Sequence, residues 1–460
     1  MNTWKLHSKS LNQEKNSTFI RDNMKPSILV TAPVKTRSGY GNHARDICTA
    51  LIELDKYDVH INSVRWGATP MTALEEGNSK HDEISKRILM EPKLPTQPDV
   101  HLHIVIPNEF QPIAKKNIGV TAGIETTIPL PQWVDGCNKM DETIFVSDFT
   151  RNVFLNASFE DKNGKQVKMK RDSSILFEGV DTDIYKQTKK ISDDVNSLFD
   201  DVKEDFGFLF VGHWLQGNLG QDRKDTGMLV KVFCETFKNQ KNPPALILKT
   251  SGADFSILDR EDILKKVRTI TDSIQGELPN VYVIHGDFTD SEMNDLYNHP
   301  KVKAHISFTH GEGFGRPLLE AAQSGKPVVA PGWSGQLDFL NPNYSILLNG
   351  SLTTVPKESF QKGVIFDSPE NKWFTVNYNV ASSIMKDMVN NYSKYLLKGK
   401  QLATVTSKQF SLEAMKVKLE EIIEKQLESV PKQVELKLPK LNKVEDSKPS
   451  EIKLPKLKKA

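Results

Sequence analysis

The sequence predicts an α/β protein of two doubly wound domains, each built on a parallel sheet, that face a central cleft. Three observations favour this class. Apolar, β-branched runs alternate with helical patterns along most of the chain, which is typical of parallel sheets with helical crossovers. Glycine-rich loops at residues 38–44 and 311–315 each follow such a run and lead into a helical pattern, as ligand-binding loops do in open parallel sheets. The chain has 460 residues, 38% of them hydrophobic, which is enough for two cores.

Charge and composition exclude several other classes. The formal net charge of +2 predicts no particular partner, and no run approaches the roughly 18 apolar residues that a membrane-spanning helix needs. Residues 1–25 are too polar for a secretory signal. The three cysteines, Cys48, Cys137 and Cys234, show neither a disulfide framework nor the spacing of metal ligands. We therefore expect a cytoplasmic protein without a metal or a cofactor.

The first domain is expected over residues 27–195, after a flexible N-terminal arm at residues 1–26. Its first strand is Ser27–Ala32, where the chain becomes continuously apolar. A helix over Asn42–Leu54 follows the first glycine loop, and Tyr57–Ser63 is the next strand. This order of strand, loop, helix and strand begins a doubly wound sheet.

The loop of this unit matches the pattern G-x-G-x-x-A, which also occurs in dinucleotide-binding proteins. The second strand ends in His60-Ile-Asn-Ser63, without the acidic residue that a nicotinamide ribose would need, so an oxidoreductase is disfavoured. Two interpretations of Gly39, Tyr40 and Gly41 are possible. The loop either holds a diphosphate or an acceptor, or it only makes a tight turn.

Further strands are expected at Val100–Ile106 and Lys116–Ala122, and Ser147 is placed to cap a helix that starts at Asp148. Glu125 follows the second of these strands directly, at the edge of the sheet where ligands bind. Its carboxylate is a candidate for contacting an acceptor or for acting as a base. An ordinary loop carboxylate is the alternative.

The first domain ends in a polar segment. Asp181-Thr-Asp183 has the form of a D-x-D metal motif, but it leads into a linker over residues 186–203 that is rich in Lys, Asp and Ser. A domain boundary near residue 195 explains this segment better than a metal site does.

The second domain is expected over residues 196–385. It restarts with a buried strand over Phe206–His213, a loop, a helix over Thr226–Lys238 and a strand over Ala245–Thr250. Arg223 with Lys224 or Lys249 can form a cationic clamp for a diphosphate, because these side chains come from one edge of the sheet. The alternative is a solvated basic loop.

The stretch Thr309–Val329 carries the strongest signal. A buried strand over Val302–Phe308 leads into the second glycine loop, a helix starts at Pro317, and Lys326–Ala330 is another strand. Glycines in the loop let the backbone approach a ligand, and the amides at the start of the helix favour a phosphate.

Glu312 in this loop and Glu320 in the helix can grip a bound molecule at two points. A carboxylate accepts two hydroxyl hydrogens at once, so the pair suits the vicinal diols of a sugar and of a ribose that are separated by a diphosphate. The alternative is a solvated loop residue and a glutamate favoured by the helix dipole.

The segment Glu312-Gly-Phe-Gly-Arg-Pro-Leu-Leu-Glu320 and the residues that follow it to Ala330 resemble the E-x7-E signature of the family 4 glycosyltransferases. The run from Glu125 to Phe154 is similar to a second segment of that family. The resemblance implies the GT-B fold, with two Rossmann-like domains, and a contact of Glu312 with the donor sugar and of Glu320 with the ribose. Arg223-Lys224-Asp225 resembles the family's R-K-G box, with Asp225 in place of glycine.

The resemblance also implies transfer with retention of anomeric configuration and without a required metal. We expect Glu312, Arg223, Lys224 and Glu125 to be the catalytic group. The expected donor-binding residues are Glu320, Gly313, Phe314, Gly315, Lys249, Gly212 and Gly335, the last of them in the loop after Val329.

The expected reaction moves a sugar from a nucleotide-diphosphate sugar to an acceptor hydroxyl. Negative charge grows on the departing phosphate, so the cations and the helix amides would lower the barrier by several kcal/mol. A retaining glycosidase would instead need two carboxyls about 5 Å apart at the bond. The alternatives are a viral-type transferase that glycosylates a modified base in DNA and a non-catalytic scaffold that binds nucleotide sugars.

The chain is expected to end in helices over residues 386–430 and a tail over residues 431–460. Leu412–Leu427 is amphipathic, and family members send a late helix back to the first domain. The tail repeats Lys-Leu-Pro-Lys-Leu at 437–441 and 453–457 and has nine lysines against four acidic residues. It is expected to be disordered, and it either makes a weak contact with an anionic partner such as nucleic acid or only solvates the chain.

Overall fold

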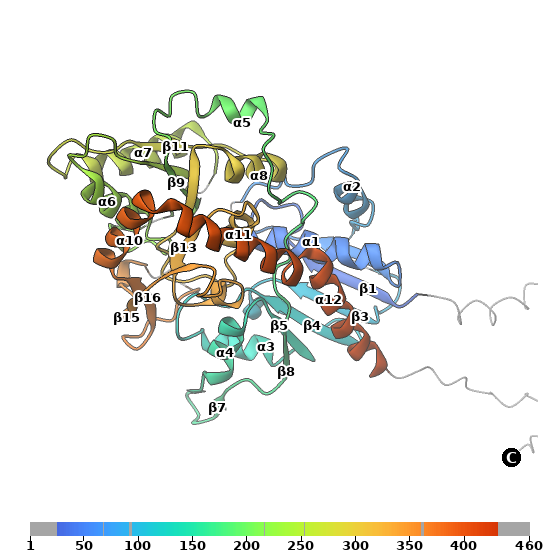
Figure 1. Cartoon of the computed structure of the whole chain (residues 1–460). Coiled ribbons are helices and arrows are strands. Elements are labelled where there is room, and N and C mark those ends of the chain that lie inside the picture. The colour runs from blue at the N-terminus through green and yellow to red at the C-terminus, as the bar shows by residue number, and fades with distance from the viewer. Residues whose placement is uncertain are drawn as a thin grey trace, which may run out of the picture.

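The computed structural model has two α/β lobes (Figure 1). It describes residues 25–67, 69–91, 94–215, 217–252, 254–359 and 363–430. Most of the predicted N-terminal arm, residues 1–24, and the whole predicted tail, residues 431–460, lie outside the described residues.

The N-terminal lobe is built on six strands, and every pair in the sheet is parallel. In their order across the sheet, the strands are β2 (Asp58–Ser63), β1 (Ser27–Ala32), β3 (Val100–Ile104), β4 (Lys116–Thr121), β5 (Glu142–Phe145) and β8 (Asp172–Ile175). The helices of this lobe are α1 (Gly39–Leu54), α2 (Ser79–Ser85), α3 (Pro131–Cys137) and α4 (Asp148–Asn156), and a short hairpin pairs β6 (Phe159–Glu160) with β7 (Gln166–Val167).

The C-terminal lobe repeats this design. Its parallel sheet has the order β11 (Val281–Ile284), β10 (Ala245–Ser251), β9 (Gly207–His213), β12 (Val302–Ile306), β13 (Val328–Pro331) and β14 (Ile346–Leu348). Helices α6 (Thr226–Phe237), α7 (Ile257–Thr271), α8 (Asp290–Asn298) and α9 (Arg316–Gln323) connect the strands. The chain reverses direction across the sheet between β9 and β12, and ligands bind at such a switch point.

Side-chain caps start several helices close to where the sequence predicts them. The Ser147 hydroxyl accepts from the amide of Thr150 at 3.2 Å, and Thr289 forms a capping box at the start of α8. The helix α1 begins three residues before the predicted Asn42, because the Ser38 hydroxyl accepts from the amide of Gly41 at 3.0 Å.

The connection between the lobes reaches the C-terminal lobe before the predicted boundary at residue 195. The Tyr185 hydroxyl donates to Asp290 at 3.0 Å, and the amide of Lys186 donates to Asn294 at 3.0 Å. The short helix α5 (Asp193–Ser197), which contains the predicted boundary, packs against α8. The linker is therefore part of the surface of the C-terminal lobe.

Three helices end the described chain. The first, α10 (Tyr378–Asn390), begins after Asn377, whose side chain caps it. It therefore extends across the predicted domain boundary at residue 385. It packs on α6, and α11 (Tyr392–Gln409) packs on α9. The last, α12 (Leu412–Glu428), lies against α1 of the N-terminal lobe (Figure 1).

Several polar contacts hold α12 on the N-terminal lobe. The Gln426 side chain donates to the buried Glu142 at 2.6 Å, and the Tyr57 hydroxyl donates to Glu424 at 2.8 Å. A glycine lets the backbone come this close, since a Cβ on Gly179 would meet the Cα of Leu412 at 2.7 Å. The chain therefore crosses between the lobes twice.

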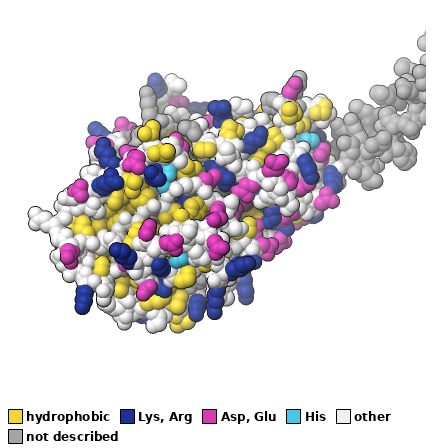
Figure 2. All heavy atoms as spheres, turned by 90° about the horizontal axis from the view of Figure 1, so that it is seen from above, with side chains coloured by type: hydrophobic (Ala, Val, Ile, Leu, Met, Phe, Trp, Pro, Cys, Tyr) yellow, Lys and Arg dark blue, Asp and Glu magenta, His cyan; other side chains and the backbone are white. Residues whose placement is uncertain are grey.

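No local pattern predicted α7 or the antiparallel hairpin of β15 (Gly350–Thr354) and β16 (Lys372–Val376), whereas α11 lies within residues 386–430, where helices were expected. Among the described residues, no helix is long and apolar enough to cross a membrane. The face of the molecule in Figure 2 has acidic and basic side chains interspersed over it, which agrees with the small net charge.

Candidate active site

A cavity of about 460 Å³ lies between the lobes, and loops that follow β1, β4, β9 and β12 line it. This volume lies within the usual range for small-molecule sites. Residues from both lobes contribute, so the site needs both sheets. The predicted site residues that line it are Gly39, Tyr40, Glu125, Gly212, Arg223, Lys224, Lys249, Glu312, Gly313, Phe314, Gly315 and Glu320.

Glu312 is the centre of the charged cluster in this cavity. Its carboxylate lies 2.6 Å from the Lys224 ammonium and 3.3 Å from the Arg223 guanidinium, and the residue is only 7% exposed. Burial alone would raise the pKa of Glu312, but the two cations outweigh it and hold this pKa below its ordinary value. The side chain is therefore an ionised acceptor for hydroxyl hydrogens or for the cations themselves.

Arg223 connects the two lobes at this point. It donates to the carbonyl of Gly311 at 2.8 Å and lies 3.4 Å from the carboxylate of Glu125, which belongs to the N-terminal lobe. Burial opposes its charge, but the nearby acids Glu125 and Glu312 raise the pKa of Arg223 above its ordinary value. The fold therefore brings together all four members of the predicted catalytic group.

Glu320 lies at the other side of the second glycine loop, in a buried ion-pair chain. Arg316 donates to it at 2.8 Å, and the Tyr297 hydroxyl donates to it at 3.3 Å. Arg316 also pairs with Asp46 on α1. Burial raises the pKa of Glu320 to about 7, and Arg316 opposes that rise. Arg316, the first residue of α9, therefore links Glu320 in the cavity to Asp46 in the N-terminal lobe.

The loop at residues 311–315 requires its glycines for a different reason than the predicted one. A Cβ on Gly313 would lie 2.6 Å from the carbonyl oxygen of Ala122, so this glycine permits close approach of the N-terminal lobe rather than of a ligand alone. Gly315 has φ 98°, which other residues rarely adopt, and it precedes α9 without a side-chain cap. Pro317 has no amide hydrogen and the amides of Leu318 and Leu319 donate to the Gly315 carbonyl, so α9 offers an anion the amide of Arg316 and the positive end of its dipole.

Two predicted residues do not line the cavity. A Cβ on Gly335 would meet the carbonyl oxygen of Gly313 at 1.9 Å, so Gly335 supports the glycine loop from behind. A Cβ on Gly41 would meet the carbonyl oxygen of Thr36 at 2.3 Å, so Gly41 closes the turn before α1. The tight-turn interpretation therefore fits Gly41, whereas Gly39 has open space around it and faces the cavity.

Tyr40 forms part of an aromatic wall in the N-terminal lobe. Its hydroxyl lies 2.9 Å from that of Thr121 and accepts from the amide of Ala122 at 3.0 Å. Its ring stacks on Trp66 with 4.1 Å between the ring centroids. Trp66 also lines the cavity, although the sequence analysis gave it no role. This wall offers an apolar face to a ring-shaped substrate.

Lys249 is held at the end of β10 beside the C-terminal sheet. Its ammonium donates to the carbonyl of Gly286 at 2.7 Å and lies 4.5 Å from the ring centroid of Phe288. Burial lowers the pKa of Lys249 to about 8. Next to it, Gly212 in β9 fits closely against an aromatic ring, because a Cβ there would lie 3.1 Å from the Phe210 side chain.

Asp225, which replaces the expected glycine, takes a backbone conformation that glycine favours. Its φ is 50° and its ψ is 34°. The Tyr378 hydroxyl donates to its buried carboxyl at 2.7 Å. The backbone therefore takes a left-handed conformation at a residue that has a side chain, and the hydrogen bond from Tyr378 offsets part of the backbone strain.

We expect the substitution Asp225→Asn to stabilise the protein increasingly from pH 4 to pH 8, by on the order of a few kcal/mol at the upper end. Burial and the negative charge of the nearby Asp222 raise the pKa of Asp225 to about 8, although the hydrogen bond from Tyr378 lowers it. His310, 3.8 Å away, adds no positive charge there because burial lowers its pKa to about 4. Between the unfolded and the folded pKa, only the folded state keeps the proton, so the wild type loses stability as the pH rises.

Urea unfolding of the two proteins at pH 4, 6 and 8 measures this difference. The asparagine keeps an oxygen that accepts from Tyr378 and suits a positive φ. A constant difference across the pH range would show that Asp225 does not hold a proton in the folded state.

Among the described residues, no group of three or more His, Cys, Asp or Glu is arranged to hold a metal ion. Arg316 and Glu178 line the cavity, although neither was predicted as a site residue. Arg316 stands inside the segment Glu312–Glu320, and Glu178 lies three residues before Asp181-Thr-Asp183. The signal for each was a charged residue next to a glycine at the end of an apolar strand or at the start of a helix.

Two Rossmann-like lobes with parallel sheets that face one cavity define the GT-B fold, and this chain has that fold. It is similar to the structure of HepE of Anabaena in complex with UDP and glucose, with 12% identity over 87% of this chain and 100% of that chain and a TM-score of 0.55. A glycosyltransferase of Rickettsia africae gives 14% identity, coverage of 88% and 99%, and a TM-score of 0.58.

The sucrose-phosphate synthase of Thermosynechococcus elongatus gives 12% identity, coverage of 87% of this chain and 98% of that chain, and a TM-score of 0.57. No protein-family model matches the chain, and neither does any curated protein sequence. At these identities the similarity establishes the fold.

Proposed function

We propose that the protein is a glycosyltransferase that moves a sugar from a nucleotide-diphosphate sugar to an acceptor hydroxyl, with retention of anomeric configuration and without a required metal. The observation that carries the proposal is the position of the two acids of the E-x7-E motif. Glu312 and Glu320 line the same interlobe cavity, and the loop Gly313–Pro317 lies between them. In this proposal Glu312 holds the sugar and Glu320 holds the ribose.

The cations in the cavity supply the electrostatic part of this chemistry. When the bond between sugar and phosphate breaks, negative charge grows on the departing diphosphate. Arg223, Lys224 and Arg316 at the start of α9 are already fixed at the cavity, so they need little reorganisation to stabilise that charge. In the free protein the two cations are paired with Glu312, and the donor's diphosphate would compete for them.

Glu125 is the acid that the N-terminal lobe offers to an acceptor. Its carboxylate lies 3.4 Å from Arg223 and lines the cavity. We propose that it orients the acceptor hydroxyl, with the aromatic wall of Tyr40 and Trp66 beside it. The neighbours that were solved with UDP and glucose or UDP-glucose support a nucleotide sugar as the donor.

A screen of nucleotide sugars by thermal shift tests the proposal. A donor that binds only the folded protein stabilises it by about 2.7 kcal/mol at 100 times its Kd, which raises the Tm. We expect one nucleotide sugar to raise the Tm and to be hydrolysed slowly in the absence of an acceptor. The proposal is wrong if UDP-, GDP-, ADP- and TDP-sugars all leave the Tm unchanged and are not turned over.

A further inference from the structure

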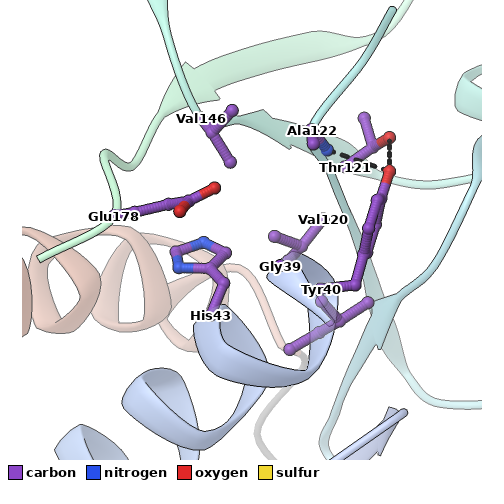
Figure 3. A pocket seen from close by; sticks show the side chains of 9 residues that line it. Gly39, Tyr40, His43, Val120, Thr121, Ala122, Val146 and Glu178 are labelled. Atoms are coloured by element: carbon purple, nitrogen blue, oxygen red, sulfur yellow. Dashed lines mark hydrogen bonds between the residues drawn. The ribbon is translucent and has the colours of Figure 1, made fainter. Parts of the chain in front are cut away.

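A small niche opens from the main cavity into the N-terminal lobe (Figure 3). Glu178, in the segment after β8, and His43 on α1 point into the same space, and Val120 and Val146 form apolar sides (Figure 3). The niche shares the lining residues Gly39, Tyr40, Ala122 and Glu178 with the main cavity. A group bound in the main cavity can therefore reach it.

Of the four polar side chains that line the niche, Tyr40 and Thr121 bond to each other, whereas Glu178 and His43 have no hydrogen-bond partner among the described residues (Figure 3). Among the described residues, none lies within hydrogen-bond or ion-pair distance of the Glu178 carboxyl, which is 7% exposed. His43 is 3% exposed, and neither of its ring nitrogens has a hydrogen-bond partner within the described chain. Buried polar groups are almost always paired in folded proteins, so these two point to a group that binds between them.

The size and charge of the niche restrict that group. Its volume is about 10 Å³, which is room for one water molecule or one hydroxyl group but not for a ring. Burial raises the pKa of Glu178 to about 8 and, with Arg316, lowers the pKa of His43 to about 3, so both side chains are neutral near pH 7. A neutral acid and a neutral imidazole each offer one donor and one acceptor, which suits a hydroxyl and disfavours a charged group.

We propose that this niche binds one hydroxyl group of the donor's sugar and thereby selects the sugar. The inference rests on the proposed function. The donor is the source because Glu178 is close enough to Glu312, Glu320 and Arg316 to feel their charges, and these residues belong to the proposed donor site. Glu178 and His43 act here as specificity residues, and a sugar without a hydroxyl at this position would leave both unpaired.

Two substitutions at Glu178 test the proposal. Methionine removes both the donor and the acceptor, whereas glutamine keeps one of each. The free protein gives Glu178 no hydrogen bond from the described residues, so neither variant loses one on folding. The ligands are UDP-glucose, UDP-N-acetylglucosamine and GDP-mannose, each compared with its free nucleotide diphosphate by calorimetric titration.

We expect Glu178→Met to bind the preferred nucleotide sugar about 10-fold more weakly than the wild type and to bind the free diphosphate equally well. We expect Glu178→Gln to keep most of the affinity for the sugar. The control is Glu109→Met, since Glu109 is an exposed glutamate of the same lobe that does not line the cavity. It should change neither affinity.

The outcomes separate this proposal from the proposed function. If no nucleotide sugar binds the wild type, the proposed function is wrong and the niche has no donor to select. If the wild type binds a nucleotide sugar and Glu178→Met binds it equally well, only the niche proposal is wrong. A Glu178→Met variant that weakens the free diphosphate as much as the sugar also contradicts it.

Discussion

Replacing Glu312 with alanine is expected to lower kcat/KM for donor hydrolysis by about 100-fold or more, which is the range seen when one preorganised group is lost from an active site. Two effects add in this variant. The donor sugar loses its hydrogen-bond acceptor, and the Lys224 ammonium loses a partner at 2.6 Å. Arg223 loses its ion pair with Glu312 at 3.3 Å, so the position of both cations changes as well.

The measurement is the release of nucleotide diphosphate from the donor found in the screen, followed by steady-state kinetics. Glu370→Ala is the matched control, because Glu370 is an exposed glutamate of the same lobe outside the cavity. A circular dichroism spectrum and a Tm for each variant show whether the fold is intact. Unchanged turnover in a folded Glu312→Ala variant would refute the proposed site, and a loss of turnover would argue against a non-catalytic scaffold.

The substitution Arg316→Met is expected to lower the free energy of unfolding by about 3–5 kcal/mol, the cost of removing one partner from a buried charge network. Arg316 pairs with Asp46 in the N-terminal lobe and with Glu320 in its own helix, and its side chain is only 11% exposed. Burial raises the pKa of Asp46 and of Glu320, and Arg316 is the main opposing charge at both. Without Arg316, both acids stay buried and unpaired.

Urea unfolding at pH 7 measures the loss. Arg268→Met is the control, since Arg268 lies on α7 and is exposed. The triple variant Arg316→Met, Asp46→Asn, Glu320→Gln should recover part of the stability, because it no longer buries unpaired charge. If Arg316→Met is as stable as the Arg268 control, the ion-pair chain does not couple the two lobes.

The sequence predicted most of the sheet strands from local patterns. Runs such as Ser27–Ala32 and Ala245–Thr250 are apolar and β-branched enough to be buried on both faces, and they are strands in the structure. Capping residues such as Ser147 marked a helix start well. These signals come from residues that are neighbours along the chain, so the sequence alone is enough to identify them.

Local patterns predicted neither α7 nor the bounds of α11 within the expected helices over residues 386–430. The helix α11 has a glycine at position 399, which is unfavourable in an isolated helix. The structure explains it, because a Cβ on Gly399 would lie 2.4 Å from the backbone of Lys326. The helix α7 has long charged stretches and only three buried residues, so its apolar pattern is weak. Both helices depend on contacts with distant parts of the chain.

The residues of the candidate site also fall into two groups: those that the sequence predicts and those that only the structure brings together. The spacing of Glu312 and Glu320 is visible in the sequence, because these residues lie in one loop and the helix that follows it. The basic pair Arg223-Lys224 is also visible, because both residues lie in one loop. The pairing of Arg316 with Asp46 and the niche of Glu178 and His43 are not, since their members are separated by more than 130 residues. Local order fixes backbone conformation and apolar pattern, whereas these cavities and charge pairs arise only when distant parts of the chain fold together.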